Sequence, residues 1–169
     1  MSLVVLTDTY ISAADCEIYL AAHYITTDAK YIAWLAVSSP NREILLRQAA
    51  KIIDRQPLQG YLAVVTQAMQ FPRILYTEYQ SNVLNNAAII QDENWYIQPS
   101  VPLNVTYAQC EIALHLAQGT SDRADLQRQG VKSFSLGNLS ESYSGTKNPI
   151  GSHEAMELLA PFVGGGFRI

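Results

Sequence analysis

Two prolines, Pro72 and Pro102, bracket a polar stretch that interrupts a chain otherwise patterned as helices. Pro72 belongs to an aromatic-Pro-Arg turn, Phe71-Pro72-Arg73, and Pro102 starts a new apolar segment. Residues 75–100 are rich in tyrosine and asparagine and show no clear period, and long segments without secondary structure are usually functional or disordered. The pattern predicts a helical body from which residues 76–98 project as a long loop or as a β-ribbon.

Capping signals mark where the helices of this body begin. Ser12, with Asp15 three residues later, forms a weaker version of the capping box. Ser39-Pro40 combines an N-cap with proline at the first helical position, and Ser152 precedes the last apolar segment. The expected helices cover residues 13–24, 28–37, 40–56, 61–70, 103–118 and 153–162.

Apolar residues at helical spacing predict the buried face of each helix. These sets are Ile18, Ala22 and Ile25; Leu45, Ala49, Ile52 and Ile53; Val105, Ala108, Ile112 and Leu116; and Ala155, Leu158, Leu159 and Phe162. The fold class is therefore mainly α, a small helical bundle in a single domain over residues 1–169. Two further features are a short hairpin-like segment at about 131–143, around Gly137-Asn138, and an extended C-terminal tail at 163–169.

Charged residues make up only 15% of the chain, below the usual level of about 25%. Ten tyrosines accompany this low charge, and tyrosine is favoured at interfaces because it combines apolar area with a polar tip. We therefore expect a subunit that buries much of its surface against other chains. The alternative is a monomer with a tyrosine-rich surface.

The net charge of −4 argues against tight DNA binding, since nucleic-acid binders normally carry a basic face. The lysines and arginines are scattered, and their densest group is Arg123, Arg128 and Lys132. An acidic wall would repel DNA and let it slide past.

The sequence shows no pattern typical of a catalytic, cofactor or metal site. Cys16 and Cys110 fall inside expected helices and are predicted to be buried free thiols. Zinc binding by Cys16 and His23 is disfavoured, because they are about 10 Å apart along a helix. Zinc binding by Cys110 and His115 is disfavoured, because side chains at i and i+5 of a helix point about 140° apart. No role is assigned to the three histidines, the third being His153. We expect no enzyme activity.

The N-terminus lacks the basic start of a signal peptide, and no stretch reaches the roughly 18 apolar residues of a membrane span. We therefore expect a protein that is intracellular, or assembled inside a cell, and that has no membrane partner.

The C-terminal tail combines mobility with an anchor. Gly164, Gly165 and Gly166 would act as a hinge that presents Phe167-Arg168-Ile169 to a partner. The alternative is a frayed terminus, because chain ends usually fray.

Arg73 is expected to pair with a helix C-terminus or with a buried carboxylate such as Asp54, and the alternative is a role at an interface. Trp34, Phe71 and Pro72 are expected to be structural.

Several ordered pieces carry a resemblance to a known family. They are Thr9-Tyr-Ile-Ser-Ala-Ala-Asp15 with Tyr19-Leu-Ala-Ala22; Trp34; Ile53-Asp54; Gly60; Gln67 with Phe71-Pro72-Arg73; Pro102 with Ala108-Gln-Cys-Glu-Ile-Ala-Leu114; Gly130-Val131 with Ser133; and Leu158-Leu-Ala-Pro161. In this order they resemble the head-tail connector (adaptor or head-completion) proteins of tailed phages and prophages, often labelled DnaT-like single-stranded-DNA-binding proteins. The family typically has Trp before its Gly, where this chain has Gln59 before Gly60.

The resemblance implies a subunit of a homo-oligomeric, twelvefold ring beneath the portal of a virion neck, assembled in the host cytoplasm. Its partners would be the portal, a downstream neck or tail protein, and genomic DNA that passes through the channel without specific binding. The portal would hold the tail, Gly164 to Ile169. Independently of the family, the aromatic content of the loop suggests Tyr76, Tyr79, Trp95 and Tyr96 as contacts to a neighbouring subunit or to the channel.

One alternative function is a single-stranded-DNA-binding replication accessory protein, and another is a different neck or tail-terminator protein. Single-strand binders use a basic groove lined with stacking aromatics. The aromatics are present in the loop, but only Arg73 lies near them in the sequence, and Asp92 and Glu93 oppose a phosphate backbone.

Overall fold

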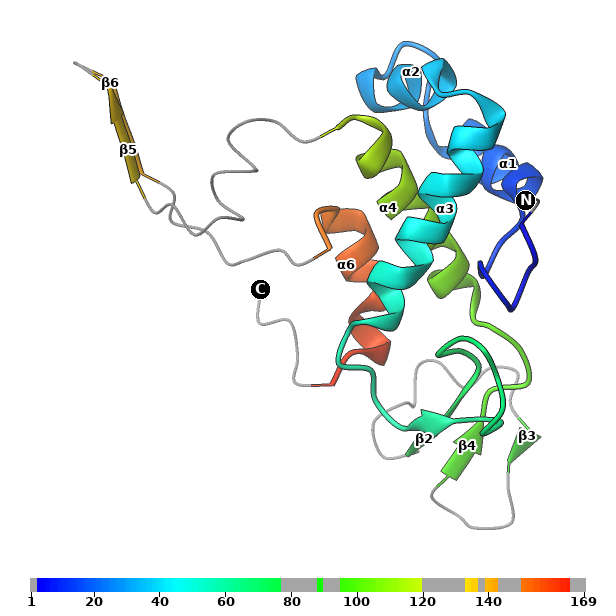
Figure 1. Cartoon of the computed structure of the whole chain (residues 1–169). Helices are drawn as coiled ribbons and strands as arrows, with labels where there is room; N and C mark the ends of the chain where they lie inside the picture. Colours follow the sequence, from blue (N-terminus) through cyan, green and yellow to red (C-terminus); the bar gives the residue numbers. More distant parts are fainter. Residues whose placement is uncertain are drawn as a thin grey trace.

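The computed structural model describes residues 3–76, 88–89, 95–119, 133–136, 139–142 and 150–164 (Figure 1). Within these ranges the helices are α1 (Ala13–His23), α2 (Ala29–Ala36), α3 (Ser39–Asp54), α4 (Leu103–Ala117) and α6 (His153–Leu159), followed by the short 3₁₀ helix η2 (Ala160–Phe162). The predicted fold class, mainly α with a small β component, is confirmed.

Helix α4 lies at the centre of the bundle and packs against α1, α2, α3 and α6 (Figure 1). Its residues Val105, Ala108 and Ile112 are fully buried, as their spacing predicts. The buried side chain of Gln109 ties α4 to two other segments, because its amide nitrogen donates to Leu46 O (2.8 Å) and its amide oxygen accepts from Tyr10 N (2.8 Å). The core is therefore organised around one helix.

The caps form largely where the sequence predicts them. Ser12 Oγ accepts from Asp15 N (3.1 Å) and Ser152 Oγ accepts from Ala155 N (3.2 Å). The N-cap of α3 is Ser38, one residue earlier than expected, so that Pro40 lies inside the first turn. Gly119, at φ +72°, follows the end of α4.

The predicted buried face of α1 is wrong. Ile18 is 68% exposed and Ile25 is 73% exposed, whereas Cys16 and Leu20 are fully buried. The helix carries apolar residues on two sides, and it packs on α4 through the side that contains Cys16 and Leu20. Ile18 is left on the surface, as is Ile25, two residues beyond the end of α1.

The helix expected at 61–70 does not form. Tyr61–Leu62 is strand β1, and a series of turns follows it. The side chain of Gln67 holds these turns, since it accepts from Val64 N (3.0 Å) and donates to Met69 O (2.7 Å) and Pro72 O (3.0 Å). These side-chain bonds replace the backbone bonds that a helix would make.

A four-stranded antiparallel sheet in the order β1-β2-β4-β3 lies beside one end of the bundle (Figure 1). Its other strands are β2 (Arg73–Tyr76), β3 (Ala88–Ile89) and β4 (Trp95–Ile97). Of the two forms predicted for residues 76–98, a loop or a β-ribbon, the pairing of Ile89 with Tyr96 agrees with the β-ribbon. Residues 77–87 and 90–94 of the expected projecting loop lie outside the described residues.

The hairpin predicted at 131–143 is confirmed by strands β5 (Ser133–Leu136) and β6 (Leu139–Ser142), which pair in register from Leu136↔Leu139. In the described ranges no helix is both long and apolar enough to cross a membrane.

Candidate functional site

Arg73 lies at the start of β2 and is only 5% exposed. Its guanidinium donates to the backbone carbonyls of Gln59 (2.6 Å), Gly60 (2.7 Å) and Gln70 (3.2 Å). Burial lowers the pKa of Arg73, and Asp54 acts on it only through its charge. Arg73 therefore holds together the segment after α3 and is not available to a partner on the surface.

The aromatic residues expected at the loop interface lie in different environments. Tyr96 is only 6% exposed and belongs to the hydrophobic core, so it is not a surface contact, and burial raises the pKa of its hydroxyl. Trp95 is partly buried, with its ring 5.7 Å from the ring of exposed Tyr61. Tyr76 pairs with Trp95 across the strands, and Tyr79 lies outside the described residues.

The C-terminal segment is attached to the chain that follows α3. Val163 bridges to Leu58, and Gly164 N donates to Pro57 O (2.6 Å). Gly164 is thus held at the base of the tail. Gly165 to Ile169, with the expected anchors Phe167 and Ile169 and with Arg168, lie outside the described residues.

Residues expected to be structural are buried. Trp34 and Phe71 are at most 1% exposed, and Pro72 is joined to Phe71 by a cis peptide bond. Cys16 and Cys110 are both buried free thiols. Burial, together with the neighbouring Cys16, raises the pKa of the Cys110 thiol.

Two of the three histidines lie on the surface. The exposed ring of His23 is tilted by 32° against the ring of Tyr19, with 4.1 Å between the ring centroids, and Tyr19 in turn stacks at 4.4 Å on Tyr107. His153 pairs with Glu157 on α6 (3.3 Å). In the part of the chain that the structure describes, His, Cys, Asp and Glu side chains do not gather into a group of three that could hold a metal.

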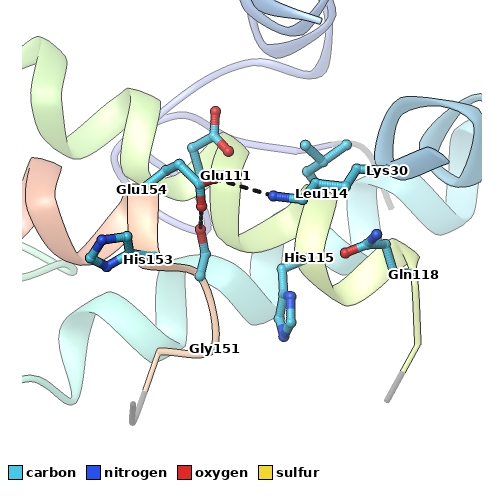
Figure 2. Close-up of a pocket in the computed structure, with 9 residues that line it drawn as sticks. Lys30, Glu111, Leu114, His115, Gln118, Gly151, His153 and Glu154 are labelled. Atoms are coloured by element: carbon cyan, nitrogen blue, oxygen red, sulfur yellow. Dashed lines mark hydrogen bonds and ion pairs between the residues drawn. The ribbon is translucent and has the colours of Figure 1, made fainter. Parts of the chain in front are cut away.

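The third histidine, His115, lines a pocket of about 240 Å³ between α4, the first turn of α2 and the start of α6 (Figure 2). Gly151, at φ +86°, lies so close to this ring that a Cβ would come within 2.7 Å of it. The other lining residues are Lys30, Glu111, Leu114, Gln118, Ser152, His153 and Glu154.

Glu111 is the most deeply buried charged residue of this pocket, at 4% exposure. Its two carboxylate oxygens accept hydrogen bonds from Tyr19 Oη (2.9 Å) and Tyr24 Oη (2.6 Å). Burial and the charge of Glu111 raise the pKa of both tyrosines. Glu111 thereby ties α4 to α1 and to the residue that follows α1.

At the rim of the pocket, Lys30 Nζ pairs with Glu154 Oε1 (3.2 Å), and Ser152 Oγ donates to Glu154 Oε2 (3.2 Å) (Figure 2). A hydrogen bond from the backbone N–H of Glu154, aided by Lys30, lowers the pKa of the Glu154 carboxyl against the opposing effect of burial. The pocket therefore contains two carboxylates and one ammonium group.

This pocket was not predicted from the sequence. The only signal was Glu111, an acidic residue in the apolar run Ala-Gln-Cys-Glu-Ile-Ala-Leu. Lys30 and residues 151–154 are far from it in the sequence, and only the packing of α2, α4 and α6 brings them together.

A second candidate site is a set of exposed apolar side chains that lie close together in the sequence. Ile18 and Ile25, with Ile32 (51% exposed) and Leu35 (47% exposed) of α2, are large aliphatic side chains in one stretch of 18 consecutive residues, 18–35. Exposed apolar residues that gather in a patch are typical of interaction sites, whereas single ones are normal.

Most basic side chains that the structure describes already have partners. Lys30, Arg42 and Arg47 pair with Glu154, Glu17 and Asp8, respectively. Arg73 is buried, and Lys51 and Arg55 are exposed near the C-terminal end of α3. These positions do not form the continuous basic groove that a single-strand binder uses.

Comparison with known proteins gave one family. Neither curated proteins nor solved structures gave a match. Residues 2–169 match the model of a family described as "Putative DnaT-like ssDNA binding protein", which agrees with the label noted for the resemblance and with the alternative function given there. Because the match spans nearly the whole sequence, the chain belongs to this family of DnaT-like proteins.

Proposed function

We propose that the protein is a non-enzymatic structural subunit that assembles with copies of itself into a ring, and that this ring is the head-tail adaptor of a phage neck. The observation that supports assembly is the exposed apolar stretch at residues 18–35, in which Ile18 on α1 and Ile25 between α1 and α2 are more than two-thirds exposed. Burying an isoleucine of this kind stabilises an interface by roughly 1.5–3 kcal/mol before ordering costs.

The placement of charge also supports an adaptor. Such a ring would surround DNA without gripping it, and in the described residues most cations are paired or buried. Its partners would be the portal, held by the tail, and a downstream neck or tail protein. Whether the chain is instead another neck or tail-terminator protein depends on which of these partners it binds.

The second candidate function is single-stranded-DNA binding, and the family description favours it. One structural feature is compatible with it: the stack of His23, Tyr19 and Tyr107 offers aromatic faces on which bases could stack. The Tyr19 hydroxyl, however, donates to the carboxylate of Glu111, whose negative charge disfavours an approaching phosphate.

One pair of measurements on the purified full chain separates the two functions. An adaptor should form closed rings in negative-stain electron microscopy, alone or with portal, and should bind a fluorescent oligonucleotide only at the level of about 10⁻⁴ M expected for non-specific contact at physiological salt. A monomer that binds single strands below micromolar, with a steep salt dependence, would contradict the adaptor and establish the DNA-binding alternative.

A further inference from the structure

We propose that the pocket between α2, α4 and α6 binds one cationic group, an alkylguanidinium or alkylammonium ion, with the carboxylates of Glu111 and Glu154 as its acceptors. This inference does not rest on ring assembly or on DNA binding, because its evidence is the lining of the pocket alone.

The first support is the balance of charge. Among the acidic and basic side chains of the lining other than histidine, Glu111 and Glu154 contribute two negative charges and Lys30 contributes one positive charge. Lys30 pairs with Glu154, and in the described ranges the hydrogen bonds of the Glu111 side chain come from two neutral tyrosines. These three side chains therefore leave one negative charge in excess.

The second support is unused hydrogen-bonding capacity. A carboxylate offers about four acceptor sites, and Tyr19 and Tyr24 occupy two of those on Glu111. A buried charge held only by neutral donors is costly, and a cation would compensate it. The same tyrosines fix the position of the Glu111 carboxylate before a ligand arrives.

The third support is that both carboxylates line the same small pocket, Glu111 from α4 and Glu154 from the first turn of α6. A guanidinium can donate to two carboxylates at once, because its five N–H groups point outward in one plane.

The fourth support is size. The volume of about 240 Å³ is below the roughly 300–1,000 Å³ of pockets for drug-sized ligands. It suits the head of one side chain or a small free cation. Leu114 adds apolar lining against which the methylenes next to the charged group can pack.

The test is a titration of the ¹⁵N-labelled full chain, followed by NMR, with N-acetyl-arginine amide, agmatine and inorganic phosphate. Both cations should shift the amide signals of 111–115 and 152–154 saturably, with a Kd on the order of 1 mM, as suits a single small group. Phosphate should leave these signals in place. If phosphate moves them, or if neither cation saturates them, the proposal is wrong.

Matched variants locate the ligand. Glu111→Gln and Glu154→Gln should each weaken arginine amide binding about tenfold or more, whereas Glu43→Gln, which removes a carboxylate outside the pocket, should bind as wild type. Glu154 is half-exposed, so its variant remains informative if Glu111→Gln fails to fold. Equal binding by Glu154→Gln and wild type would overturn the proposal.

The two probes also separate the sources of the ligand. If agmatine binds more than tenfold tighter than N-acetyl-arginine amide, the ligand of the pocket is a free small molecule. If N-acetyl-arginine amide binds as tightly as agmatine or tighter, the ligand of the pocket is a side chain of a partner protein.

Discussion

Gly60 lies directly against the backbone of Ile74: a Cβ on Gly60 would come within 1.9 Å of the Ile74 carbonyl oxygen. The neighbouring strands β1 and β2 meet here, and the Arg73 guanidinium donates to the Gly60 carbonyl (2.7 Å). Gly60 also has φ +74°, a conformation that favours glycine. The closeness and the dihedral angle are two separate requirements for the same residue.

Gly60→Ala should therefore lower the free energy of unfolding by about 3 kcal/mol or more, because both the clash and the strained φ act on it. Gly119→Ala is the matched control. Gly119 has nearly the same φ, +72°, but nothing lies within 4 Å of its added Cβ, so about 1 kcal/mol is expected. Denaturant unfolding followed by circular dichroism measures both, and equal losses would show that the contact with Ile74 is unimportant.

Alkaline pH should destabilise the protein. Burial raises the folded-state pKa of Tyr10, Tyr19 and Tyr24, so their contribution to stability is complete below the unfolded pKa of about 10 and is lost as pH rises toward the folded value. Each such tyrosine should contribute a slope of up to about 1.4 kcal/mol per pH unit above pH 10. Urea unfolding at pH 8 to 11 measures the slope.

Tyr24→Phe should make this slope shallower, whereas Tyr61→Phe, which alters an exposed tyrosine, should leave it unchanged. An unfolding free energy that stays constant up to pH 11 would contradict the hydrogen bonds that Tyr19 and Tyr24 donate to Glu111 and that Tyr10 donates to Asp54.

The exposed isoleucines Ile18, on α1, and Ile25, just beyond its end, should matter for assembly and not for folding. Ile18→Ser with Ile25→Ser should change the free energy of unfolding by no more than about 0.5 kcal/mol, because both side chains are already in solvent. The same double variant should lose ring formation in analytical ultracentrifugation. Val65→Ser, at a 91% exposed residue in the turns after β1, is the control and should assemble normally.

The tail should be dispensable for folding when it is cut after Gly164. The hydrogen bond from Gly164 N to Pro57 O is then kept, so removing 165–169 should leave the melting temperature unchanged and abolish attachment to portal in co-sedimentation. Removing Gly164 as well should cost about 1 kcal/mol from the lost bond. Attachment of the shorter chain at the wild-type level would show that the tail is no anchor.

The helices could be predicted from the sequence because their signals are local. Ser12, Asp15 and Ser152 cap helices through contacts within three residues, and the spacing of Val105, Ala108 and Ile112 lies within one helix. The buried face of α1 could not be predicted, since α1 is apolar on two sides and only contact with α4 decides between them.

The helix wrongly expected at 61–70 failed for the same reason. The pairing of Tyr61 with Ile74 and the clamp of Arg73 are contacts over more than ten residues, and they override the local preference of an apolar run. The pocket was even harder to predict from the sequence, because Lys30 and Glu154 are 124 positions apart and only the fold brings them into contact.

The bridge between Leu58 and Val163 also defines a path for mechanical force. Three bonds join the two segments, namely Gln59 N to Phe162 O, Gln59 Nε2 to Val163 O, and Gly164 N to Pro57 O. A force applied to the chain beyond Gly164 is therefore shared between η2 and residues 57–59. The hydrogen bond from Arg73 Nε to the Gln59 carbonyl transmits part of this force to β2. Tension on the C-terminus would thus be carried by the sheet as well as by α6, so that no single helix bears the load.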